Sequence, residues 1–206
     1  MKKMLVMLLS VLMALMASWA GAEEAEPTVY ESGDWEYVLL EDGTAEIYDY
    51  TGWDKELTIP EAIDGYAVTV IGDSAFDSCR SLTSITIPDS VTAIGDEAFY
   101  DCDSLTSITI PDSVTSIGTY AFYYCTGLTS ITIPESVTSI EISAFYNCSG
   151  LEKVYYTGTA DEWAAITVGS DNSELLNATR YYYSATEPTE EGNYWHYDED
   201  GNPVIW

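Results

Sequence analysis

The sequence predicts a repeat solenoid, a fold in which successive coils of the chain stack and bury a shared core. Three observations support this fold class. A phrase of 23 residues recurs almost letter for letter through the middle of the chain, its apolar residues keep constant positions, and a cysteine marks each copy. We therefore expect a right-handed, β-rich solenoid of about four 23-residue coils with parallel strands and terminal caps.

The copies agree position by position. Two consecutive copies run over 79–99 and 102–122, and both carry three isoleucines, a proline, a valine and an alanine–phenylalanine pair at the same offsets. The third copy ends at Cys148 and has Glu141 where the others have glycine. Because the spacing is constant, equivalent residues of neighbouring coils are expected to lie above one another.

An earlier copy spans 57–79 and contains five extra residues around 63–66. The apolar spacing on either side is intact, so we expect these residues to bulge outward as a turn. The last copy loses the pattern after Leu151, which assigns the repeats to 57–156. The core is expected from the inward residues of each copy, which in one copy are Leu82, Ile85, Ile87, Val91, Ile94, Ala98, Phe99 and Cys102.

Residues 1–22 have the pattern of a secretory signal peptide. Lys2 and Lys3 precede an apolar run, and 20–22 supply the small residues that signal peptidase accepts. We expect cleavage after Ala22, export from the cell, and no membrane insertion of the mature chain. No cysteine at the cleavage site takes a lipid, so the expected location is secreted or cell-surface associated.

The chain is strongly acidic, with 35 aspartates and glutamates against 6 lysines and arginines and a formal charge of −29 at pH 7. Loss of the two signal lysines would make the mature chain still more negative. Nucleic acids and anionic lipids are bound by clustered basic residues, so both partner classes are excluded. Scattered carboxylates favour solubility, and attraction to a cation or a basic partner is the alternative.

Residues 23–56 are expected to form a β-hairpin cap before the first coil. The stretch 37–50 alternates apolar and polar residues on both sides of an Asp-Gly pair at 42–43, which is typical of a hairpin. A solenoid without a polar terminal element exposes its core. The hairpin is therefore expected to cover that end, with Trp35 and Trp53 packed beneath it.

Residues 157–183 are expected to form the C-terminal cap. Thr159 and Glu162 have the spacing of a capping box at the start of a short helix. A second helical turn is expected at 173–178, followed by a strand at 180–183 that closes the stack.

Residues 184–206 are interpreted as a linker and an aromatic tail. The linker is rich in threonine, glutamate and serine, a composition that favours an extended, solvated chain. The tail places Trp195 among tyrosines and a histidine, and 203–206 is expected to return as a second arm. A single hairpin of this size is marginal unless it packs on something.

The unit C-x-x-L-x-x-I-x-I-P-x-S-V-x-x-I-G-x-x-A-F, complete over 79–99 and 102–122, resembles the BspA-like class of bacterial leucine-rich repeats. The closing segment from Tyr155 to Ile166 is also similar to that family. The resemblance implies a leucine-rich-repeat solenoid in a secreted or surface protein that mediates binding and adhesion. It implies no shared catalytic residues, and partners differ among members, so no site is carried over.

The four cysteines, Cys79, Cys102, Cys125 and Cys148, leave two states open. Neighbouring coils lie about 4.8 Å apart, so disulfides between adjacent coils are sterically allowed. Equivalent side chains in a stack point the same way, however, which favours buried free thiols. Four ligands on one line cannot converge on tetrahedral zinc, and we expect neither a metal site nor a cofactor.

Tyrosine follows the core phenylalanine in three consecutive copies, at Tyr100, Tyr123 and Tyr146, with Tyr124 and Tyr120 nearby. Tyrosine gives large amphipathic contact area at low entropic cost. We therefore take this row, together with Trp195 of the tail, as the candidate partner-binding residues. The alternative is that the rings only shield the segment beneath them.

The expected function is a non-catalytic binding or adhesion module for an extracellular protein or glycan, and the protein is not expected to be an enzyme. One alternative is a carbohydrate or cell-wall binding accessory domain that uses the exposed tyrosines and the tail tryptophans. A carboxylate-based hydrolase is a weaker alternative, because a thin solenoid offers little concavity. His196, the only histidine, is peripheral, so no histidine-based catalytic set is expected in the core. The sequence does not indicate the oligomeric state.

Overall fold

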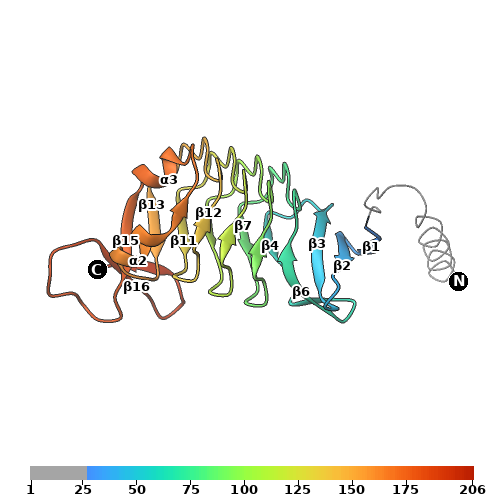
Figure 1. Cartoon of the computed structure of the whole chain (residues 1–206), viewed down its shortest axis with the longest axis horizontal. Helices are drawn as coiled ribbons and strands as arrows, with labels where there is room; N and C mark the ends of the chain where they lie inside the picture. The colour runs from blue at the N-terminus through green and yellow to red at the C-terminus, as the bar shows by residue number, and fades with distance from the viewer. Residues whose placement is uncertain (1–26) are drawn as a thin grey trace, which may run out of the picture.

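A computed structural model describes residues 27–206 as an elongated stack of coils with two parallel sheets along its length. Figure 1 shows the coils side by side between an N-terminal and a C-terminal cap. The predicted signal peptide lies outside the described residues. In the part of the chain that is described, no helix is long and apolar enough to span a membrane. The predicted solenoid class is confirmed.

One sheet, here called sheet A, contains six parallel strands, one from each coil. Neighbouring strands pair in register, so that Ile71, Ile94, Ile117 and Ile140 follow one another across the sheet. The strands, in order, are β3 (Ala45–Tyr50), β6 (Tyr66–Ile71), β8 (Ala93–Ile94), β10 (Ser116–Ile117), β12 (Ser139–Ile140) and β14 (Thr167–Val168).

Sheet B runs along the other side of the coils. Its central register joins Ile85 to Ile108 and Ile108 to Ile131, and these side chains point into the core. Its parallel strands are β4 (Glu56–Thr58), β7 (Ser84–Thr86), β9 (Ser107–Thr109), β11 (Ser130–Ile133), β13 (Lys153–Tyr156) and β15 (Thr179–Tyr183).

The coil count exceeds the expected value of about four. Each sheet has six parallel strands among the described residues, which makes six coils. The first uses β3 of the predicted hairpin, and the last uses β14 and β15. These outer coils depart from the repeated phrase because stacking requires a backbone register and buried side chains of suitable volume, and many sequences meet that requirement.

The core is a set of ladders of identical residues. Phe76, Phe99, Phe122 and Phe145 stack with ring centroids 5.1, 5.2 and 5.1 Å apart, and all four are fully buried. Such spacing lets every ring contact its neighbours on both faces. The predicted inward valines, isoleucines and alanines are likewise buried.

A glycine directly follows four of the six sheet A strands, at Gly72, Gly95, Gly118 and Gly169, and permits close stacking there. A Cβ built on Gly118 would lie 2.5 Å from the carbonyl carbon and oxygen of Gly95 in the preceding coil. Backbone at that distance cannot accommodate a side chain. Gly118 is therefore required for packing at its own position, whereas the equivalent position after β12 is occupied by Glu141.

The N-terminal cap contains the predicted hairpin and one additional strand. Strand β2 (Trp35–Leu39) pairs antiparallel with β3, and β1 (Val29–Ser32) pairs with β2. The insertion bulges as predicted, because β5 (Ala62–Ile63) forms a tight hairpin with β6.

The two tryptophans expected beneath this cap differ in their environments. Trp35 packs on Tyr50 and Phe76. The prediction for Trp53 is wrong, because its side chain is 85% exposed. It lies between β3 and β4, in a connection without regular secondary structure.

The C-terminal cap contains the two predicted short helices. Helix α2 (Ala160–Ala165) begins at a complete capping box, in which the Thr159 hydroxyl accepts from the Glu162 amide and the Glu162 carboxylate accepts from the Thr159 amide. Helix α3 (Ser173–Asn177) follows β14. The expected closing strand, β15, continues the sheet, because β16 (Tyr194–Tyr197) pairs with it.

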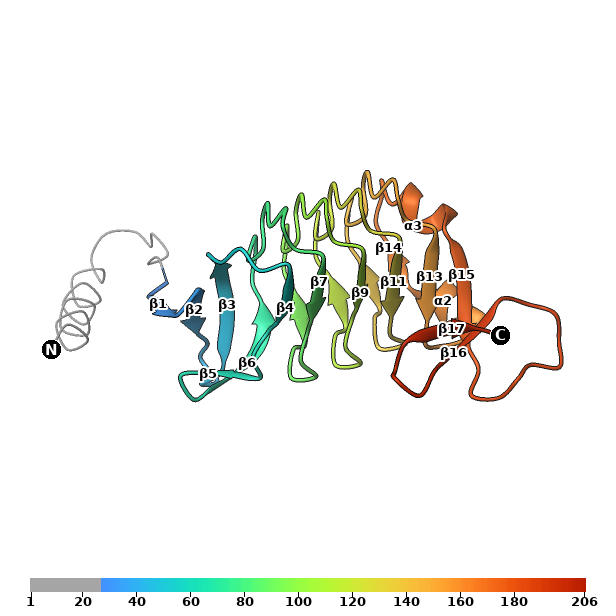
Figure 2. The ribbon, with the colours of Figure 1, turned by 180° about the vertical axis from the view of Figure 1, so that it is seen from behind.

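The aromatic tail forms the expected hairpin and packs on the solenoid. Strand β16 pairs antiparallel with β17 (Pro203–Ile205), and Figure 2 shows the pair in front of the lower part of the C-terminal coils. Trp195 is fully buried, and its Nε1 donates to the Tyr156 carbonyl at 2.9 Å. Thr132 on the outer face of β11 is buried, whereas the equivalent Thr109 is exposed.

Candidate contact surface

The segments that connect each sheet A strand to the next sheet B strand are here called the return segments. They form the row of narrow turns along the upper edge in Figure 1. Backbone amides link one return segment to the next: Phe99 donates to the Ala121 carbonyl, and Phe122 to the Ala144 carbonyl, both at 2.7 Å. The same backbone path therefore recurs in every coil and places equivalent side chains in line.

Two residues in each of the four return segments after β6, β8, β10 and β12 have a left-handed backbone, although neither is glycine. After β10 these are Tyr120 (φ 57°) and Tyr124 (φ 62°), and after β8 they are Glu97 and Asp101. A bulky side chain rarely adopts this conformation, which costs roughly 1–2 kcal/mol per residue. Asparagine, aspartate or glycine would be the better residue for the backbone at both tyrosine positions.

Tyr100, Tyr123 and Tyr146 form a stacked row on the return segments. The ring centroids of Tyr100 and Tyr123 are 5.0 Å apart with planes 8° from parallel, and those of Tyr123 and Tyr146 are 5.0 Å apart at 15°. Both faces of the central ring are covered. Among the described residues no side chain hydrogen-bonds to the three hydroxyls, and none of them is a buried polar atom, so the row presents its hydroxyls to solvent.

Two further tyrosines enlarge the row into a patch. Tyr120 meets the Tyr123 ring edge to face at 5.2 Å, and Tyr124 packs against it at 4.8 Å. The exposed fractions of Tyr124 and Tyr146 are 41% and 40%. We call the five residues Tyr100, Tyr120, Tyr123, Tyr124 and Tyr146 the tyrosine patch.

The hydroxyls of Tyr100 and Tyr123 stay neutral near pH 7. Burial raises the pKa of Tyr100 above its ordinary value, and the carboxylates of Asp101, Glu97 and Asp77 raise it further. Burial and the neighbouring tyrosines raise the pKa of Tyr123. Each hydroxyl therefore remains able both to donate and to accept a hydrogen bond.

Carboxylates border the N-terminal end of the patch. Asp77 occupies, one coil earlier, the position of Tyr100 after the core phenylalanine. Asp101 follows Tyr100 and accepts from the guanidinium of Arg80. Sequence reasoning missed these residues, although the comparison of Phe76-Asp77 with the equivalent Phe-Tyr pairs contains the signal.

The candidate residues from the sequence do not all come together. Tyr100, Tyr123, Tyr124 and Tyr146 share one surface, whereas Trp195 lies in the tail at the other side of the coil. The inclusion of Trp195 is contradicted by its complete burial, since its ring packs on Tyr155 and Tyr197 and leaves no surface for a partner.

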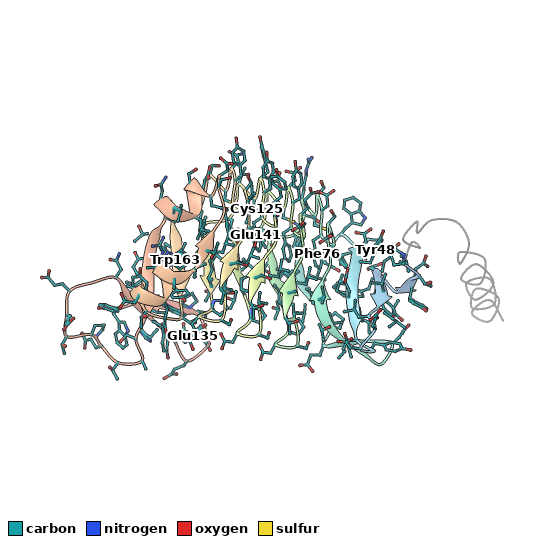
Figure 3. The ribbon with its side chains drawn as sticks, in the orientation of Figure 1. Tyr48, Phe76, Cys125, Glu135, Glu141 and Trp163 are labelled. Atoms are coloured by element: carbon teal, nitrogen blue, oxygen red, sulfur yellow. The ribbon has the colours of Figure 1, made fainter. Side chains whose placement is uncertain are left out.

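All four cysteines are free thiols; Cys102, Cys125 and Cys148 are buried in the core, as the sequence indicated, and Cys79 is half-buried at its edge. The Sγ atoms of Cys102, Cys125 and Cys148 each donate to the carbonyl of a core phenylalanine at 3.0–3.2 Å. Burial raises the pKa of Cys148 to about 12. Figure 3 labels Cys125 within the return segments. These thiols are unsuited to nucleophilic chemistry, which requires an accessible thiolate.

A hollow of about 760 Å³ lies between the tail and the turns at the edge of the coils opposite the return segments. It is lined by Asp112, Glu135, Ser136, Thr157, Glu162, Tyr183 and Tyr197. Hydrogen bonds from Thr159 lower the pKa of the Glu162 carboxyl, whereas a general acid needs a raised pKa. Among the described residues no three His, Cys, Asp or Glu side chains are placed to hold a metal ion.

Comparison with known proteins relates the chain to bacterial repeat proteins. The family model described as "BspA type Leucine rich repeat region" matches six copies over residues 46–165, in agreement with the six coils. A comparison with curated protein sequences finds no significant match.

Two solved structures are similar in fold and sequence. A leucine-rich repeat protein of T. pallidum is 27% identical with a TM-score of 0.65, over 76% of this chain and 72% of that one. A leucine-rich repeat protein from Bacteroides ovatus is 26% identical with a TM-score of 0.51, over 80% of this chain and 47% of that one.

Proposed function

Because the chain belongs to the family of BspA-type leucine-rich repeat proteins, we propose that it is a secreted or surface-associated, non-catalytic module that binds an extracellular protein. The tyrosine patch is its contact surface. The observation that carries this proposal is the stacked row of Tyr100, Tyr123 and Tyr146, whose edges and hydroxyls face solvent. Tyrosine is enriched in protein interfaces because it joins apolar area to a polar tip.

Two features of the tyrosine patch support a role in binding rather than only in covering the core. The phenylalanine stack beneath it is fully buried also at Phe76, which is followed by Asp77 in place of a tyrosine, so burial of the core ring does not require a tyrosine at this position. Tyr124 also occupies a left-handed position that a smaller residue would fill at lower cost. Strain at an exposed aromatic residue motivates a hypothesis of function.

The stacking geometry favours a protein over a glycan as the partner. Sugar rings stack on the open faces of aromatic rings. Both faces of Tyr123 are covered by its neighbours in the row. Of the tail tryptophans, Trp195 is buried and Trp206 is stacked on His196 at 3.9 Å.

The proposal is tested by binding of the mature chain, residues 23–206, to an array of extracellular matrix proteins and glycans. A saturable protein signal is expected. The triple variant Tyr100→Ser, Tyr123→Ser, Tyr146→Ser should lose it, because the row no longer offers aromatic area. The matched control is Tyr48→Ser with Tyr66→Ser, which removes two tyrosines that are exposed and lie outside the patch; Figure 3 labels Tyr48 at the N-terminal end.

Each outcome of the array has a defined meaning. Loss of binding in the triple variant with an unchanged melting temperature supports the patch. Equal loss in the control pair, or full binding by the triple variant, contradicts it. A signal for glycans alone, abolished by the triple variant or by Trp206→Ala in the tail, would favour the carbohydrate-binding alternative.

A further inference from the structure

The tyrosine row ends at its N-terminal side on carboxylates. Tyr123 covers one face of the Tyr100 ring, and no other aromatic ring of the described residues stacks on the opposite face. That face is directed toward the preceding coil, where Asp77 takes the equivalent position. Asp77 and Glu97 are exposed, and Asp101 is next to Tyr100. One aromatic face and three carboxylates therefore lie together.

This combination suits a cationic side chain. A guanidinium or ammonium group is attracted to the face of an aromatic ring and more strongly to a neighbouring carboxylate. Backbone hydrogen bonds place all three acidic residues beside Tyr100: its amide donates to the Glu97 carbonyl at 2.9 Å, and its carbonyl accepts at 2.8 Å from the amide of Ser78, which follows Asp77. Asp101 is the next residue in the chain, and the three carboxylates raise the pKa of Tyr100. The net charge of the whole chain is also negative, with 35 acidic residues against 6 basic ones, so a basic partner is attracted at long range.

The cations of the chain itself show both interactions. The Arg180 guanidinium carbon lies 3.9 Å from the centroid of the Trp163 ring. Arg80 reaches into the next coil and donates to the Asp101 carboxylate from Nε and a terminal nitrogen. Arg80 thus occupies one of the three carboxylates at the end of the row, while Asp77 and Glu97 have no basic side chain within ion-pair distance in the described residues.

We propose that the tyrosine patch and its border of Asp77, Glu97 and Asp101 recognise a basic segment of an extracellular protein, with an arginine or lysine of the partner between the Tyr100 ring and these carboxylates. This inference rests on the proposed function and names its partner class. A bare metal ion fits less well, since no set of three ligand side chains is assembled in the part of the chain that is described.

The experiment measures the binding of fluorescein-labelled nona-arginine, nona-lysine and nona-glutamate peptides to the mature chain, followed by anisotropy at 50 and 200 mM salt. Both basic peptides should bind, more weakly at the higher salt because the attraction is electrostatic. Nona-glutamate should not bind. Asp77→Asn should raise the Kd by about three- to tenfold, and Tyr100→Leu should do the same, whereas Tyr100→Phe, which keeps the ring, should not.

Two further variants separate a local site from general attraction to an acidic chain. Asp89→Asn removes an equal charge from an exposed turn at the edge opposite the return segments and should leave the Kd nearly unchanged. Arg80→Gln frees the Asp101 carboxylate and should tighten binding by about two- to fivefold. The control is Lys55→Gln, which also removes one positive charge but frees no carboxylate of the patch, and its gain in affinity should be smaller.

Several results would overturn the inference. These are an equal effect of Asp89→Asn and Asp77→Asn, an equal gain in Arg80→Gln and Lys55→Gln, or no binding of the basic peptides. The array distinguishes a failure of this inference from a failure of the proposed function. If the array gives a patch-dependent signal for a protein without a basic segment, the patch is the contact surface and the cationic partner class is wrong.

Discussion

At the scale of single residues, identical side chains at identical places carry the fold. Phe122 is fully buried between Phe99 and Phe145 with ring centroids 5.2 and 5.1 Å away. A ring in such a stack has two aromatic neighbours, and its removal leaves a cavity that the rigid coils cannot fill by collapse.

Phe122→Ala is therefore expected to lower the free energy of unfolding by about 3–5 kcal/mol, the usual cost of deleting a buried phenylalanine ring. Urea unfolding followed by circular dichroism measures this change. Tyr48→Ala, which removes an exposed ring, is the control and should have a small effect. A melting curve of Phe122→Ala that matches the unmodified chain would show that the register of the coils is wrong.

A substitution at Tyr124 distinguishes a role of the tyrosine patch in binding from a role in stability. Its φ of 62° is left-handed, and the equivalent residue two positions after the core phenylalanine is Asp101 in one neighbouring coil and Asn147 in the other. Asparagine tolerates this conformation. The backbone thus gains from Tyr124→Asn while the contact with Tyr123 is lost.

We expect Tyr124→Asn to change the free energy of unfolding by less than about 1 kcal/mol, since relief of backbone strain offsets the lost ring contact. Affinity for the partner should fall by about tenfold, or about 1.4 kcal/mol, because tyrosine is among the few residue types that carry most of the binding energy of an interface. Calorimetric melting and titration measure the two effects. Strong destabilisation without loss of affinity would indicate that the ring only shields the chain beneath it.

At the scale of elements, the tail hairpin shows where sequence reasoning stops. The hairpin itself was predictable from a turn between two aromatic arms, and so was the capping box of α2, because both are local patterns. The docking place of Trp195 was not, since it depends on where the 184–193 connection returns the chain. The exposure of Trp53 escaped prediction for the same reason: it lies in a connection without a repeat pattern.

Trp195→Ala is expected to undock the tail without unfolding the coils. The indole is fully buried and donates to the Tyr156 carbonyl, whereas the rest of the hairpin is mostly exposed. Limited proteolysis should then cut within residues 184–206, and hydrogen exchange of β16 and β17 should accelerate. Trp206→Ala, which removes a 44% exposed ring, is the matched comparison. Protection of β16 that survives Trp195→Ala would contradict this docking.

At the scale of the whole molecule, the structure has more coils than the sequence pattern predicted. The repeat can be recognised in the sequence only where glycine, isoleucine and phenylalanine recur together. The first coil uses Ala45 and Ile47, and the last uses Leu175 as a buried residue. Parallel strands pair through backbone hydrogen bonds, and the core needs buried side chains of suitable volume, so particular residue types are not required. The position of the patch was predictable from the repeat spacing, but the covered ring faces were not, because they depend on side-chain rotamers.

The core also makes stability depend on alkaline pH. Burial raises the pKa of Cys79 and Cys148 from 9.0 to about 12, and burial with a hydrogen bond to Asp54 raises that of Tyr50 from 10.0 to about 12. The folded state holds these protons more tightly than the unfolded state. The resulting stability is complete below about pH 9 and is lost as the pH rises toward 12.

The melting temperature is therefore expected to fall steadily between pH 9 and 12. In Cys148→Ala, which removes one of these groups, the fall should be shallower than in the unmodified chain. A differential scanning calorimetry series in matched ionic strength measures both. A melting temperature that stays constant to pH 12, or equal slopes in the two chains, would contradict the burial of the thiols.

The central claim is that the tyrosine patch is the contact surface, and hydroxyl-radical footprinting with mass spectrometry tests it most directly. The oxidation rate of each tyrosine is compared in the mature chain alone and with the protein partner from the array. The oxidation rates at Tyr124 and Tyr146, the two exposed members of the patch, are expected to fall on binding, while those at Tyr48, Tyr66 and Tyr183 stay unchanged. Protection confined to those three tyrosines, with Tyr124 and Tyr146 still oxidised at the free rate, would contradict it.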